Sequence, residues 1–206
     1  MTIMEKLDLA KTDKTYYSAP TQPQEATFGE RPYLAVAGAG DPNGPAFAAA
    51  AEALYTVAYT VKAAAKRMGR DFTVPKLEGL WWVEGGGDGL KVARELWQYK
   101  LLIRMPDFVS RETAEDARTA AAAKKPELAP IGAVAYETLH EGRCVQIMHV
   151  GPYATEPETL AKLEHYIAEA GLVYNGNHHE IYLSDPKRSK PEAMKTILRY
   201  PVAARD

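Results

Sequence analysis

Apolar and polar residues alternate along several short stretches of the chain, the pattern typical of half-buried β-strands. The clearest stretch is 178–183, where Ile181 and Leu183 face one side while His178, Glu180 and Tyr182 face the other. Similar patterns predict strands at 33–38, 77–84, 97–105, 134–139, 143–150 and 195–201. The short turn at 141–142 predicts a hairpin between the fourth and fifth of these.

Helical spacing of three and four residues appears in other stretches. It predicts a long amphipathic helix over 46–68, ended by Gly69, and a surface helix over 110–125. A third helix is expected to begin at Thr155, because Thr155 and Glu158 have the spacing of a capping box. Its buried stripe and its end are marked by Leu160, Leu163, Ile167 and Gly171.

The order of elements repeats along the chain. Each half carries a strand, a Gly/Pro loop, a helix and two more strands, with repeats at about 30–125 and 130–206. We therefore expect one α+β domain over 1–206, built from duplicated strand-helix-strand-strand modules around a pseudo-two-fold axis. Antiparallel sheets would enclose a central ligand cleft. Glu84 and Glu180 are expected on corresponding strands.

Composition narrows the class of protein. The 206 residues are 46% hydrophobic and 25% charged, with a net charge of −2, as in ordinary globular proteins. No basic block indicates direct nucleic-acid binding. No apolar run approaches the ~18 residues of a membrane span, and the N-terminus lacks the apolar core of a signal peptide. One cysteine, Cys144, excludes an intrachain disulfide. These features predict a cytoplasmic protein with no membrane partner.

Glu180 is the strongest candidate for chemistry. Its pattern places a carboxylate in mid-strand on the same face as Tyr182. A glutamate on an edge strand facing water is the simpler interpretation. A carboxylate among aromatic rings, however, binds delocalised cations or acts in acid–base catalysis.

Aromatic residues supply the candidate ligand-binding surface. Alternation requires Trp81 and Trp82 to face opposite sides, so one belongs to the core and the other to the cleft. Trp97 and Tyr99 share a face with Leu101, which leaves core packing open for both. The candidate ligand-binding residues are Trp82, Trp97, Tyr99, Tyr55, Tyr136, His149, Tyr153 and Tyr182. The spacing of the histidines does not supply the three or four ligands that a metal site needs. We therefore expect no metal site, and we expect no cofactor.

Six stretches resemble the GyrI-like small-molecule-binding domain family, which also forms the effector-binding part of AraC- and MerR-type regulators. They span most of the chain in order: GDPN (40–43), LYTVAYTVK (54–62), LEGLWW (77–82), YKLLIRMPDF (99–108), CVQIMHVGPY (144–153) and HHEIYLSDP (178–186). The resemblance implies paired strand-helix-strand-strand modules, an aromatic cleft and a key acidic residue that corresponds to Glu180. The chain leaves no room for a helix-turn-helix domain and is expected to be a stand-alone member.

The resemblance implies two functions. Stand-alone relatives are associated with hydrolysis of cyclopropane-bearing genotoxins of the duocarmycin and yatakemycin kind. Here Glu180 would deprotonate water, aromatic rings would stack on the substrate, and a tyrosine or histidine would donate to its dienone oxygen. Alternatively, the protein only binds a small aromatic or cationic molecule, with Glu180 as counter-ion, or inhibits gyrase as the namesake does. The oligomeric state stays open.

Overall fold

The computed structural model describes residues 6–86 and 89–205. The helices are α1 (Leu9–Thr12), α2 (Pro45–Arg67), α3 (Arg111–Lys124) and α4 (Glu156–Glu169). The strands are β1 (Gln24–Ala39), β2 (Leu77–Val83), β3 (Trp97–Arg104), β4 (Ala135–Val150), β5 (Leu172–Tyr174), β6 (His178–Tyr182) and β7 (Lys195–Ala204). Short 3₁₀ turns are η1 (Gly89–Lys91), η2 (Arg94–Leu96), η3 (Ala129–Ala133), η4 (Tyr153–Thr155) and η5 (Pro191–Ala193).

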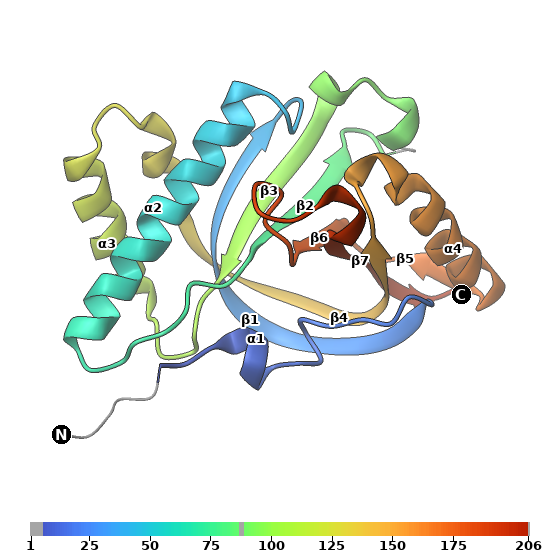
Figure 1. The fold of residues 1–206 in the computed structure, drawn as a ribbon, viewed down its shortest axis with the longest axis horizontal. Helices are drawn as coiled ribbons and strands as arrows, with labels where there is room; N and C mark the ends of the chain where they lie inside the picture. The colour runs from blue at the N-terminus through green and yellow to red at the C-terminus, as the bar shows by residue number, and fades with distance from the viewer. Residues whose placement is uncertain (1–5, 87–88, 206) are drawn as a thin grey trace.

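The strands form one antiparallel sheet in the order β4-β1-β3-β2-β6-β7-β5 (Figure 1). β4 also pairs with β7, so the sheet closes into a barrel. The first half contributes β1-α2-β2-β3, and the second contributes β4-α4-β6-β7 with the short β5 added. This confirms the predicted α+β class and its duplicated strand-helix-strand-strand modules, which meet where β2 pairs with β6.

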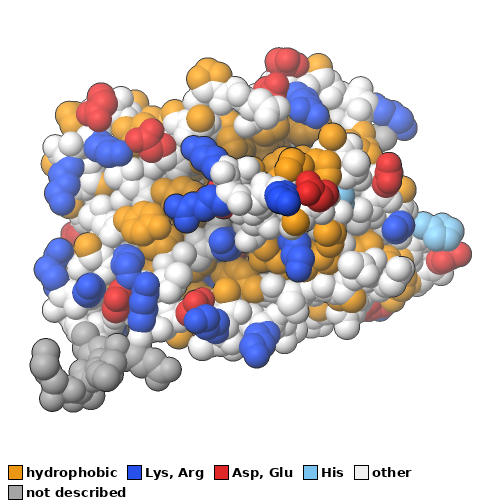
Figure 2. Space-filling view, in the orientation of Figure 1, with side chains coloured by type: hydrophobic (Ala, Val, Ile, Leu, Met, Phe, Trp, Pro, Cys, Tyr) orange, Lys and Arg blue, Asp and Glu red, His pale blue; other side chains and the backbone are white. Residues whose placement is uncertain are grey.

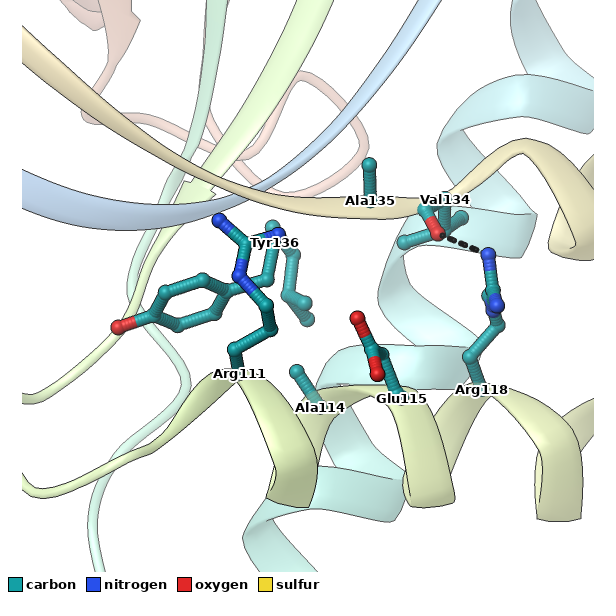
Figure 3. A pocket seen from close by; sticks show the side chains of 8 residues that line it. Arg111, Ala114, Glu115, Arg118, Val134, Ala135 and Tyr136 are labelled. Atoms are coloured by element: carbon teal, nitrogen blue, oxygen red, sulfur yellow. Dashed lines mark hydrogen bonds between the residues drawn. The ribbon is translucent and has the colours of Figure 1, made fainter.

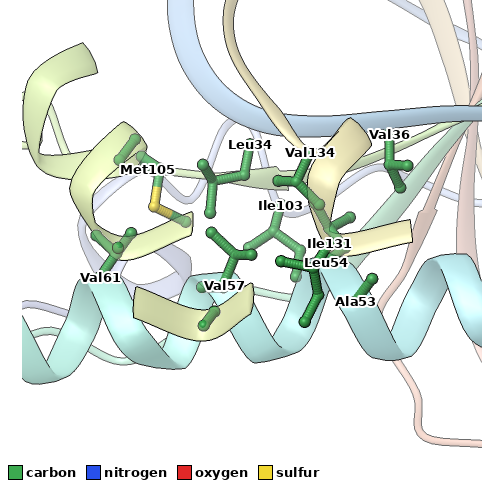
Figure 4. Close-up of a cluster of buried hydrophobic side chains, with 14 of the residues drawn as sticks. Leu34, Val36, Ala53, Leu54, Val57, Val61, Ile103, Met105, Ile131 and Val134 are labelled. Carbon is green, nitrogen blue, oxygen red and sulfur yellow. The ribbon is translucent and has the colours of Figure 1, made fainter. Parts of the chain in front are cut away.

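Helices cover separate parts of the barrel. α2 packs on β1 and β3 and α4 packs on β4 and β5, so β2 and β6 lie between them. The apolar face of α2 fills a core with residues of β1, β3 and the segments around α3 (Figure 4). The stripe of Leu160, Leu163 and Ile167 on α4 packs against β4 and β7, as its spacing predicts.

The barrel interior combines aromatic rings with a buried network of charges. Tyr16, Phe28 and Tyr33 pack there with Ile181 and Ile197. The segment before the first predicted strand also contributes to this interior. Pairing with β4 extends β1 back to Gln24, and the preceding segment brings Tyr16 and Tyr17 into the core.

The charged network joins four strands inside the barrel. His179 of β6 contacts Glu141 of β4 at 2.7 Å through Nδ1 and Glu78 of β2 at 2.9 Å through Nε2. Arg199 of β7 donates to Glu141 at 2.8 Å, and the Tyr16 hydroxyl donates to Glu78 at 2.6 Å. Each buried charge therefore has an oppositely charged partner within hydrogen-bonding distance.

The predicted hairpin at 141–142 is wrong. β4 runs without reversal through Glu141 and Gly142, because both predicted strands pair with the same long β1, from Ala35 opposite Ala135 to Gln24 opposite Gln146. Gly142 does adopt a positive φ of 66°, a local irregularity in the strand.

Two other local predictions had different outcomes. Thr155 occupies the N-cap position of α4, but the capping hydrogen bond is absent. Its hydroxyl donates instead to the Pro152 carbonyl at 2.9 Å, because the chain enters the helix through η4. Gly69 ends α2 as predicted, with φ of 81°. The predicted hairpin connection at 85–89 lies partly outside the described residues.

Apolar and basic side chains occupy different parts of one face of the molecule. In the view of Figure 2, apolar side chains lie in the recessed middle of the face, and lysine and arginine side chains lie around them. No helix in the described part of the chain has the length and apolar character that crossing a bilayer requires.

Candidate functional site

The candidate site is the outer face of β2 and β6, between α2 and α4, which we call the interhelical face. In the β2–β6 pairing Gly79 is opposite Glu180 and Trp81 is opposite His178. Directly paired residues share a face of the sheet, so Gly79, Trp81, His178, Glu180 and Tyr182 lie together on the side away from the barrel interior.

This register decides between the adjacent tryptophans. Trp81 lies on the interhelical face with Glu180, and the alternation of a strand turns Trp82 to the opposite face. The prediction that Trp82 lines the cleft is therefore wrong. Alternation shows that Trp81 and Trp82 face opposite sides of the strand, but it does not show which of the two faces the cleft.

The Glu180 carboxylate is held by two neighbours on its own strand. The Tyr182 hydroxyl donates to Oε2 at 2.7 Å, and His178 Nε2 lies 3.0 Å from Oε1. The Tyr182 hydroxyl in turn accepts a hydrogen bond from Trp81 Nε1 at 3.0 Å. Burial and the charge of Glu180 hold the pKa of Tyr182 well above its usual range. Tyr182 therefore keeps its proton at neutral pH and fixes the orientation of the carboxylate.

An aromatic wall borders this carboxylate on the side of α2. Phe47 of α2 stacks on Trp81 with ring centroids 5.8 Å apart, and the Trp97 ring meets Trp81 edge-on at 5.9 Å. Trp97 Nε1 donates to the Gly89 carbonyl at 3.0 Å, which fixes its ring. Tyr99 packs behind Trp81 and is only 2% exposed. Tyr99 therefore supports the wall from the core and does not line its surface.

The side toward α4 carries Tyr153 and Glu156. The Tyr153 ring meets Tyr182 edge-on at 6.0 Å, and burial with nearby Glu156 and Glu180 raises the pKa of Tyr153 to about 12. Glu156 is 9% exposed, and burial together with the charge of Glu180 raises its pKa to about 9. The sequence analysis missed Glu156, because a glutamate in the first turn of a helix is ordinary and no local pattern shows that it is buried.

Another candidate ligand-binding residue, Tyr55, lies on α2. Tyr55 of α2 stacks on Tyr59 with centroids 6.4 Å apart, and burial raises its pKa, while a hydrogen bond from the Leu77 backbone opposes the shift. Tyr55 also packs against the apolar core beneath α2.

Tyr136 belongs to a different pocket, between α3 and the start of β4 (Figure 3). Its hydroxyl donates to the Val109 carbonyl at 2.9 Å, and Arg111 lies over its ring. Its part of β4 pairs with β1, which β3 and β2 separate from β6. The prediction that Tyr136 shares the site of Glu180 is wrong.

His149 is 3% exposed and holds the segment before α4. Its Nδ1 lies 2.8 Å from Thr159 Oγ1, and its Nε2 lies 3.1 Å from the Pro152 carbonyl oxygen. Both ring nitrogens therefore contact the start of α4 or the turn before it. Glu84 is exposed in the turn after β2 and does not belong to that strand, so the expectation that Glu84 and Glu180 lie on corresponding strands is wrong.

The described residues contain no group of three or more His, Cys, Asp or Glu side chains that could hold a metal ion. The interhelical face carries carboxyl groups, phenols, an imidazole and aromatic rings.

The model of the GyrI-like small molecule binding domain matches residues 90–202. The chain belongs to this family. An uncharacterized conserved protein from Listeria innocua is 40% identical with a TM-score of 0.89, over 96% of this chain and 100% of that one. A hydrolase from Listeria innocua is 38% identical with a TM-score of 0.83, over 96% and 100%. No curated protein matches the sequence.

A more distant solved structure shares the fold. The C-terminal domain of EcmrR is 11% identical with a TM-score of 0.59, over 89% of this chain and 98% of that one. The GyrI-like assignment agrees with the resemblance found in the sequence, and it identifies the chain as a small-molecule-binding domain.

Proposed function

We propose that this GyrI-like protein hydrolyses the strained cyclopropane of planar genotoxins of the duocarmycin and yatakemycin kind. The observation that carries the proposal is the Glu180 carboxylate, oriented by Tyr182 at 2.7 Å and placed beside an aromatic wall. Similarity to proteins described as hydrolases from Listeria innocua, at 38% and 39% identity, supports a catalytic role.

The reaction needs a base and a flat apolar surface. Trp81 and Trp97 offer ring faces and edges to a planar substrate. Glu180 takes a proton from a water molecule that attacks the methylene carbon of the cyclopropane. The ring opens toward the dienone, which becomes a phenol, and release of ring strain drives the reaction forward.

A second function rests on the same carboxylate. A negative charge among aromatic rings binds delocalised organic cations through charge and cation–π attraction. In this case Glu180 acts as a counter-ion, and the protein sequesters its ligand unchanged.

Mass spectrometry of a duocarmycin-type cyclopropane, incubated with substoichiometric protein, separates these functions. Catalysis gives more ring-opened product than protein present, above a control without protein. Glu180→Gln is expected to retain binding and lose most turnover, about 10²-fold or more, while Glu84→Gln, at an exposed position, turns over normally. No product above the control, together with loss of cationic ligands in Glu180→Gln, would establish the binding function instead.

A further inference from the structure

Glu156 is fixed at the edge of the interhelical face. It is the first residue of α4, and His149 holds the preceding turn through the Pro152 carbonyl and α4 through Thr159. Thr196 of β7 lies beside the Glu156 carboxyl group and opposes part of the rise in its pKa. Thr196 pairs with Tyr182 across β6 and β7, so Glu156 lies over the strand next to Glu180.

Among the described residues, the groups that act on the Glu156 carboxyl group include no cation. From β6 it faces Glu180 and Tyr182, and from η4 it faces Tyr153. The uncharged Thr196 faces it from β7, and His149 of β4 has both ring nitrogens engaged with Thr159 and Pro152. Asp185, after β6, adds another negative charge on this side.

One oxygen of this carboxyl group has no partner. Oε1 is buried and makes no hydrogen bond to any described residue, and the whole residue is 9% exposed. An unpaired carboxylate at such a position is costly, and the neighbouring Glu180 adds like-charge repulsion. The raised pKa of about 9 has these causes. We therefore expect the Glu156 carboxyl group to be protonated at neutral pH.

We propose that Glu156 is the general acid of the site and donates its proton to the substrate oxygen that gains charge as the ring opens. This role rests on the hydrolase function proposed above. Acid–base catalysis often uses two carboxyl groups in different environments, one of which stays protonated while the other is ionised. Glu180 serves as the base and Glu156 as the acid.

The step balances without an oxidant or a cofactor. One O–H bond of water breaks and its proton goes to Glu180, while the water oxygen forms a bond to the cyclopropane methylene carbon. The carbon–carbon bond of the ring breaks, and its electron pair moves through the dienone to the carbonyl oxygen. That oxygen takes the proton of Glu156. Proton exchange through solvent then returns a proton from Glu180 to Glu156, and the sum is addition of one water.

The test is the pH profile of kcat for the full chain and its Glu156→Gln variant, with Glu158→Gln as the control, an exposed glutamate on the same helix. We expect wild-type kcat to fall as pH rises through about 9, where Glu156 loses its proton. Glu156→Gln should lower kcat at neutral pH by about 10²-fold, leave substrate binding within about twofold and abolish the alkaline fall. Glu156→Asp should restore part of the activity and the alkaline fall.

Infrared difference spectroscopy provides a readout that needs no substrate. A protonated carboxyl band present at neutral pH, lost in Glu156→Gln and kept in Glu158→Gln, would support the proton on Glu156. If the wild type opens rings and Glu156→Gln does so equally with the same pH profile, the donor role is overturned and the hydrolase function stands. If the wild type opens no rings, both fail, and the infrared band then reports only the protonation of Glu156.

Discussion

Gly79 lies directly opposite Glu180 in the antiparallel pairing of β2 with β6. A Cβ atom at Gly79 would lie 2.8 Å from Trp81 Nε1 and 3.0 Å from the Tyr182 hydroxyl. The absent side chain makes room for the hydrogen bond from Trp81 to Tyr182, and Tyr182 orients the Glu180 carboxylate. Gly79 is therefore part of the geometry of the site, although it contributes no functional group.

Replacing Gly79 by alanine should displace the Trp81 indole. We expect a stability loss of about 1–3 kcal/mol from overpacking and a drop in ligand affinity or turnover of at least about tenfold, since a 1.4 kcal/mol loss is a tenfold change. Tryptophan fluorescence, urea denaturation and ligand titration would measure these effects. Gly29→Ala is the control, because nothing lies within 4 Å of a Cβ there. Equal ligand binding in the two variants would contradict this account of Gly79.

Tyr182→Phe removes the donor to Glu180 and leaves Trp81 Nε1 without its acceptor. We expect a loss of about 1–2 kcal/mol in the free energy of unfolding and a larger loss in kcat than in substrate affinity, because the carboxylate is no longer oriented. Tyr174→Phe, at a 50% exposed position, is the control. Steady-state kinetics with urea denaturation would test this, and an unchanged kcat would show that Glu180 is oriented without Tyr182.

The charged network in the barrel predicts how stability depends on pH at the alkaline side. Contacts to Glu141 and Glu78 raise the pKa of buried His179 to about 9. A raised pKa means that the stabilisation is complete below the unfolded value, roughly 6.5, and is lost as pH rises through about 9. Urea denaturation between pH 6 and 10 should show this decline, and His179→Gln should flatten it. The same alkaline slope in His179→Gln would assign the decline to other groups.

At acid pH, the stability of the protein depends on Glu141. Contacts with His179 and Arg199 lower its pKa to about 2 despite burial. Its stabilisation is complete above its unfolded value, roughly 4.3, and is lost as pH falls toward about 2. Glu141→Gln should remove this dependence and cost about 3–5 kcal/mol in the free energy of unfolding, because Arg199 loses its buried partner.

A matched exposed pair provides the control for Glu141. Glu137 accepts from Lys100 at 2.7 Å, with side chains 41% and 31% exposed. Glu137→Gln should cost about 0–1 kcal/mol by urea denaturation. Similar losses for Glu137→Gln and Glu141→Gln would contradict the importance given to the buried network.

The local periodicity, and the features that depend on it, can be read from the amino-acid sequence alone. Alternation placed Ile181 inward and Glu180 outward, and helical spacing identified the faces of α2 and α4. The repeated element order predicted the duplicated modules. These features follow from how single segments divide apolar from polar side chains, and no knowledge of partner strands is needed.

Which segments of the chain meet in space is known only from the folded protein. Trp81 and not Trp82 lies beside Glu180, because the register with β6 selects the face. Glu156 is a functional candidate because it is buried in the first turn of α4, near Glu180 and Thr196. No local pattern in the sequence shows this burial. β4 continues through Gly142 because the long β1 pairs with both of its halves. Register and burial are set by contacts between residues far apart in the chain, which periodicity does not encode.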